Sequence, residues 1–147
     1  MEKFFTASQV DKRSDFVELI RYVYGDSNGK LTRSLDFKSE GVSDFETFAE
    51  ALKASGSYNA FEAEKTIEAF RSIWDEIGGV EIAREGSPVL YVVIPFFTNQ
   101  RTIGSSYGER IDSGKRKKLI DEIKAIAKDL EADEITDDEY RVRIWWD

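Results

Sequence analysis

The chain has 147 residues, of which 41% are hydrophobic and 34% charged, and this balance excludes disordered and collagen-like proteins. Its length suits one domain with one hydrophobic core, and we expect a single domain over residues 1–147. Because the sequence contains neither cysteine nor histidine, it excludes disulfides, thiolate chemistry and histidine as a general base or metal ligand.

Charge and hydropathy also limit the partners. Residues 1–8 lack the basic and apolar regions of a secretion signal, and no apolar run approaches the roughly 18 residues that span a bilayer. We therefore expect a cytoplasmic protein that does not bind membranes. The net charge of −8 disfavours general binding of nucleic acid, because that binding needs a basic surface. No cofactor or metal is expected.

The first half of the chain is predicted to be mainly helical. Apolar residues recur at helical spacing in three segments, which are 9–24, 43–55 and 59–77. Ser43 and Glu46 form a capping box at the start of the second segment, and Asn59 caps the third. A weak strand at 30–37, expected at a sheet edge or as irregular structure, lies between the first two helices.

Two strands, 80–84 and 89–97, are predicted next, joined by a compact hairpin connection. The second strand is apolar on both faces, so we expect it at the centre of the sheet with both sides covered. Pro95 cannot donate a hydrogen bond to a neighbouring strand. The strand should therefore bend or end there.

The last third is predicted to form a helix at 113–130, an acidic linker at 131–139 and a strand at 140–146. Alternation in this strand gives two faces, one with Tyr140, Val142, Ile144 and Trp146, the other with Arg141, Arg143 and Trp145. A strand, helix and strand in succession favour a right-handed crossover with parallel strands. The predicted fold class is α+β, with an N-terminal helical half packed on a small mixed β-sheet that ends in a ββαβ unit.

A long loop, 98–114, follows the predicted central strand and is a candidate binding site. Long loops in compact domains usually serve a function, and ligands collect at the carboxyl ends of sheet strands. Four cations, at 115–118, begin the next helix, where the helix dipole favours a bound anion over positive side chains. The candidate residues for a ligand or anion are Asn99, Arg101, Ser105, Ser106, Tyr107, Arg110, Lys115 and Arg116.

Two alternatives limit this interpretation. The cations at 115–118 also fit a solvated helix face that reaches carboxylates such as Asp112 or Asp121. A nucleotide-hydrolysing phosphate loop is disfavoured, because five residues separate Gly108 from Gly114 where that motif has four, and Arg116 replaces its Ser or Thr. The seven carboxylates within 129–139 fit a solvated turn better than a metal site.

Arg141, Arg143 and Trp145 on the last strand, with Tyr107, are the predicted partner-binding residues. Arginine, tryptophan and tyrosine dominate the hot spots of protein interfaces. The alternative is a strand whose polar face is simply solvated.

The leading functional hypothesis is a non-enzymatic protein-binding module, such as a small acidic inhibitor, an immunity protein or a phage anti-defence protein. It rests on the missing histidine and cysteine, the absence of an intact catalytic motif and the negative charge. No catalytic residue is assigned. The alternative is a domain that binds a small ligand or phosphate through residues 98–118, with or without an enzymatic activity.

Overall fold

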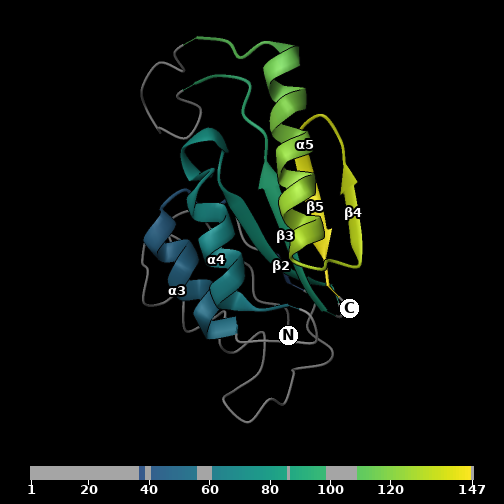
Figure 1. The fold of residues 1–147 in the computed structure, drawn as a ribbon. Coiled ribbons are helices and arrows are strands. Elements are labelled where there is room, and N and C mark those ends of the chain that lie inside the picture. Colours follow the sequence, from purple (N-terminus) through teal and green to yellow (C-terminus); the bar gives the residue numbers. More distant parts are fainter. Residues whose placement is uncertain (1–36, 39–40, 56–60, 86, 99–108, 147) are drawn as a thin grey trace.

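The computed structural model describes residues 37–38, 41–55, 61–85, 87–98 and 109–146 (Figure 1). Within them the chain forms three α-helices, which are α3 (Phe45–Ser55), α4 (Ala63–Arg71) and α5 (Ser113–Asp129). A short 3-10 helix, η1 (Trp74–Glu76), follows α4. The strands are β1 (Phe37–Lys38), β2 (Val80–Glu85), β3 (Ser87–Val93), β4 (Glu134–Asp137) and β5 (Arg141–Trp145). The α+β class is thus confirmed, whereas the predicted helix 9–24 lies outside the described residues.

The sheet has the order β1-β2-β3-β5-β4, and all its neighbouring strands are antiparallel. The predictions of a mixed sheet and a parallel crossover were therefore wrong. The reason is β4, which lies inside the segment predicted to be a linker and pairs with β5 as a hairpin. This extra strand reverses the chain once more after α5, so β5 runs antiparallel to β3 and the unit is ββαββ.

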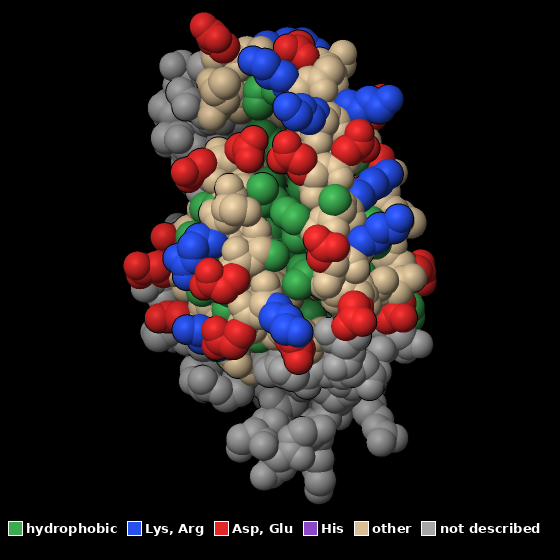
Figure 2. All heavy atoms as spheres, viewed as in Figure 1, with side chains coloured by type: hydrophobic (Ala, Val, Ile, Leu, Met, Phe, Trp, Pro, Cys, Tyr) green, Lys and Arg blue, Asp and Glu red, His purple; other side chains and the backbone are tan. Residues whose placement is uncertain are grey.

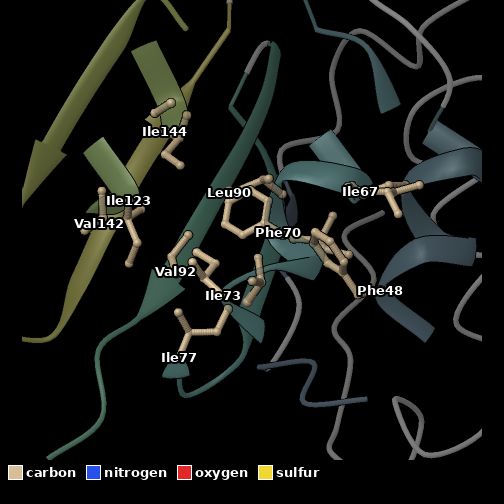
Figure 3. Close-up of a cluster of buried hydrophobic side chains, with 14 of the residues drawn as sticks. Phe48, Ile67, Phe70, Ile73, Ile77, Leu90, Val92, Ile123, Val142 and Ile144 are labelled. Carbon is tan, nitrogen blue, oxygen red and sulfur yellow. The ribbon is translucent and has the colours of Figure 1, made fainter. Parts of the chain in front are cut away.

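β3 is the central strand, as predicted, because it pairs with β2 on one side and β5 on the other. Its residues Leu90 and Val92 are buried in the main core (Figure 3). On the opposite face Val89 is buried, while Tyr91 and Val93 are half-buried. The strand ends at Val93, shortly before Pro95, in agreement with the missing donor of that proline.

The three helices and one face of the sheet enclose a single core. Asp44 begins α3 by accepting hydrogen bonds from the amide nitrogen and Oγ1 of Thr47 at 3.0 and 2.7 Å. The ring of Phe48 on α3 packs edge-on against Phe70 on α4, with centroids 5.6 Å apart. Figure 1 shows α5 beside these helices, over β3 and β5, and its Ile123 belongs to the same core.

The predicted single helix 59–77 is divided into α4 and η1, so this prediction was too long. Asn59 lies outside the described residues, and α4 begins after Glu62, whose side chain makes no capping hydrogen bond. Ala60 of the predicted apolar stripe also lies outside the described residues. The other members of the stripe are buried, namely Ala63, Ile67, Phe70, Trp74 and Ile77. A 3-10 turn keeps the last two on the side that faces the sheet.

Gly79 connects η1 to β2 and must be glycine for two reasons. Its φ of 109° lies in the left-handed region that side chains disfavour. A Cβ atom there would also lie 2.8 Å from the carbonyl oxygen of Val42. This close approach lets Val42 and Val80 exchange backbone hydrogen bonds of 2.8 and 3.0 Å, which fixes η1 at the end of the sheet.

Candidate functional site

A cleft of about 320 Å³ lies beyond the carboxyl end of β3. It forms where η1, the two ends of the predicted loop and the first turn of α5 meet. Its apolar lining consists of Ile77, Pro95, Phe97, Ile111 and Leu119. Its charged lining consists of Asp75, Glu76, Glu109, Arg110, Lys115 and Arg116. The cleft therefore combines an apolar surface with charges of both signs, as small-molecule sites do.

Backbone hydrogen bonds join the two ends of the loop beside this cleft. The amide of Thr98 donates to the carbonyl oxygen of Glu109 at 3.0 Å, and that of Ile111 donates to Phe96 at 2.7 Å. The hydroxyl of Thr98 also accepts from the Glu109 amide at 3.1 Å. These bonds hold Arg110 at the cleft, although the rest of the loop, 99–108, lies outside the described residues.

The first turn of α5 places Lys115 and Arg116 at the same cleft. The carboxylate of Asp112 accepts a hydrogen bond of 2.8 Å from the Lys115 amide and so caps the helix. A negative charge at this position opposes the unfavourable effect of the neighbouring cations on the helix dipole. The predicted helix start at 113 is confirmed, and a bound anion is not needed to explain it.

Arg116 connects three elements through its guanidinium group. Its Nε donates to the carbonyl oxygen of Pro95 at 3.2 Å, and its Nη2 donates to that of Glu139. The guanidinium carbon also lies 3.7 Å from the ring centroid of Phe96, which is a cation–π contact. Arg116 thereby joins α5 to the end of β3 and to the turn before β5.

Tyr140 is exposed beside this cation–π contact, whereas Val142, Ile144 and Trp146, which were predicted to share its face of the last strand, are buried. Tyr140 is 58% exposed, and its ring centroid lies 5.6 Å from that of Phe96. The alternation that buries Val142 does not extend to Tyr140, because β5 begins only at Arg141.

The turn that carries Tyr140 is held by Asp138. Its carboxylate accepts hydrogen bonds from the amides of Tyr140 and Arg141 at 2.7 and 2.9 Å. These two bonds lower the pKa of Asp138 below its usual value, because they favour the ionised carboxylate. The run of acids before the strand was the sequence signal for this turn.

The predicted partner-binding residues of β5 share one face of the sheet, as expected. Arg141, Arg143 and Trp145 are each half-buried. Arg141 Nε lies 3.3 Å from Glu81 Oε1, and Arg143 Nη1 lies 3.5 Å from Glu134 Oε1. Both arginines thus form ion pairs within the sheet, and their assignment to partner binding stays a prediction.

Other predicted residues fall in three groups. Arg110, Lys115 and Arg116 are brought together at the cleft, which fits the predicted ligand site. Five lie outside the described residues, namely Asn99, Arg101, Ser105, Ser106 and Tyr107. Trp146 is buried and donates from Nε1 to the Leu130 carbonyl at 3.0 Å, so it belongs to the core. Sequence reasoning missed the cleft residues Asp75 and Glu76, because no motif connects η1 to the loop, and it passed over Glu109 because only cationic and polar loop residues were considered for an anion.

The acidic segment does not form a cluster within the described part of the chain. Its β4 residues are extended, so successive side chains point to opposite faces. Among the described residues no group of three or more carboxylates is placed to hold a metal ion. In the same part of the chain, none of the helices has the length and apolar character needed to cross a bilayer.

No protein-family model, curated protein or solved structure matches this chain. Functional inference therefore rests on the geometry of its own residues.

Proposed function

We propose that the chain is a non-enzymatic protein-binding module, of the kind found among small acidic inhibitors, immunity proteins and phage anti-defence proteins. Its docking surface is the aromatic–arginine surface, defined as Phe96, Arg116 and Tyr140. The observation that carries the proposal is the exposure of Tyr140, a residue that is 58% exposed and whose ring lies against Phe96. Tyrosine and arginine are among the residues that contribute most to protein interfaces.

The contacts of this surface make it ready to bind. Arg116 is held by two backbone carbonyls and by the ring of Phe96, and the turn carrying Tyr140 is held by Asp138. A surface fixed before binding loses little side-chain entropy when a partner docks. Less of the favourable contact energy is then offset by the ordering of side chains, so the affinity is higher.

The charge around Tyr140 indicates the chemistry of the partner. Asp138 and Glu139 precede it and are exposed, and the whole chain carries a net charge of −8. Such a surface fits an apolar pocket bordered by lysine and arginine on the partner, and the charge would accelerate association at low salt. Binding should therefore weaken as ionic strength rises.

The test is affinity capture from source cells, followed by calorimetry with the purified partner. Tyr140→Ala should lower the affinity by roughly 2 kcal/mol or more, as expected for a hot-spot residue, whereas Tyr140→Phe should retain most of it. Asp121→Ala is the control, because Asp121 is exposed on α5 and is not part of the aromatic–arginine surface. If Tyr140→Ala binds the partner as tightly as the wild type does, this docking surface is wrong.

A further inference from the structure

The cleft contains charged side chains of both signs that do not pair with one another. Among the described residues, the ion pairs of the chain join other groups. In that part of the chain, the carboxylates of Asp75, Glu76 and Glu109 and the cationic groups of Arg110 and Lys115 form no ion pair. Because these groups do not neutralise one another, each can attract an opposite charge on a ligand that lies between them.

The charges come from several elements of the fold, and the loop end alone contributes one of each sign, Glu109 and Arg110. Asp75 and Glu76 belong to η1, whereas Lys115 belongs to the first turn of α5. Figure 2 shows hydrophobic side chains along the middle of this face of the molecule, with acidic and basic side chains intermixed on both sides of them. A ligand with only negative groups would meet the carboxylates of η1, and one with only positive groups would meet Arg110 and Lys115. Each would be repelled by half of the site.

We propose that this cleft binds a zwitterionic small molecule with an apolar body, of the size of a large amino acid or a dipeptide. Its carboxylate contacts Lys115 and Arg110, its ammonium group contacts Asp75 and Glu76, and its apolar part covers Ile77 and Leu119. The cleft volume of about 320 Å³ is at the lower end of the range for small-molecule sites. This refines the predicted anion site, because the acidic half of the cleft excludes a simple anion.

The probe is the dipeptide leucyl-phenylalanine, titrated calorimetrically into the full chain. Its N-acetyl derivative lacks the ammonium group, its C-terminal amide lacks the carboxylate, and inorganic phosphate serves as a simple anion. We expect the dipeptide to bind and to raise the unfolding midpoint. Either modification should weaken binding at least about tenfold, because it removes one charge-assisted contact.

Two variants test the two sides of the cleft. Glu76→Gln removes the charge at constant size, and Lys115→Gln replaces the cation with a shorter neutral side chain; each should weaken dipeptide binding at least about tenfold. Lys118→Gln is the matched control, because Lys118 is exposed on the same helix outside the cleft. Tyr140→Ala should leave dipeptide binding unchanged, which separates this proposal from the docking of a protein partner. The proposal is overturned if the dipeptide does not bind, or if phosphate or either modified dipeptide binds as tightly as the dipeptide.

Discussion

Replacing Arg116 by alanine should destabilise the fold, because one side chain connects α5, the end of β3 and the turn before β5. The change removes two hydrogen bonds from a charged donor to the carbonyls of Pro95 and Glu139. A hydrogen bond to a charged group contributes about 1.5–3 kcal/mol, and the part-buried bond to Pro95 favours the lower end. The bond to Glu139 is exposed and contributes less, about 0.5–1 kcal/mol, and the cation–π contact with Phe96 adds about 0.5–1 kcal/mol. We expect a total loss of roughly 2.5–3.5 kcal/mol in the free energy of unfolding.

Urea unfolding followed by circular dichroism measures this loss, and a thermal scan should show a midpoint lower by roughly 5–14 °C. Lys117→Ala is the control, because Lys117 is exposed on the same turn of α5, and it should change stability by less than about 0.5 kcal/mol. Arg116→Lys keeps the charge but not the planar group that donates in two directions, so it should recover only part of the loss. If Arg116→Ala and Lys117→Ala unfold at the same urea concentration, the connecting role of Arg116 is refuted.

Two further substitutions test the core and the turn. Leu90→Ala, at a side chain only 1% exposed in the central strand, should cost about 2–5 kcal/mol in urea unfolding, and a negligible change would contradict the central position of β3. Asp138→Ala should lower stability at neutral pH. Because the native pKa of Asp138 is lowered, its contribution is complete above the usual value of 3.8 and is lost as the pH falls through the lowered pKa. Unfolding midpoints of wild type and variant should therefore converge in acid, and a difference that does not depend on pH would contradict this role of the carboxylate.

The elements that the sequence predicted well are those with strongly buried apolar residues in a regular pattern. In α5 the residues Leu119, Ile123 and Ala127 are buried at helical spacing, so the pattern of burial was visible in the order of residues. β3 was found for a related reason, since a run of apolar residues that ends near a proline has few other structures available. In both cases local pattern and tertiary packing favour the same structure.

β4 was missed because an edge strand of this kind has almost no hydrophobic signal. Of its four residues only Ile135 is half-buried, and the other three are exposed. Charged side chains on an edge strand discourage association with other sheets, but they also make the segment resemble a solvated linker. The error was large in its consequence, because one missed strand changed the direction of β5 and with it the type of sheet.

The cleft was predicted only in its basic half, and the reason is the distance along the chain between its two sides. Arg110, Lys115 and Arg116 are close in sequence and follow a predicted strand, so they could be grouped without a structure. Asp75 and Glu76 reach the cleft because Gly79 turns the chain sharply into β2 and places η1 at the end of the sheet. Residue patterns do not encode that juxtaposition.

The position of Arg116 has a consequence for how the two proposed surfaces relate to each other. Its guanidinium lines the cleft and also supports Phe96, against which Tyr140 lies. A ligand carboxylate that attracted this guanidinium would compete with the carbonyls of Pro95 and Glu139 and so loosen the support of Tyr140. Ligand in the cleft and a protein at Tyr140 should then weaken each other's binding by the same factor, as thermodynamic linkage requires. Lys115 and Glu76 make no contact with Phe96 or Tyr140 within the described residues, so substitutions there separate ligand binding from partner docking, whereas substitution of Arg116 affects both.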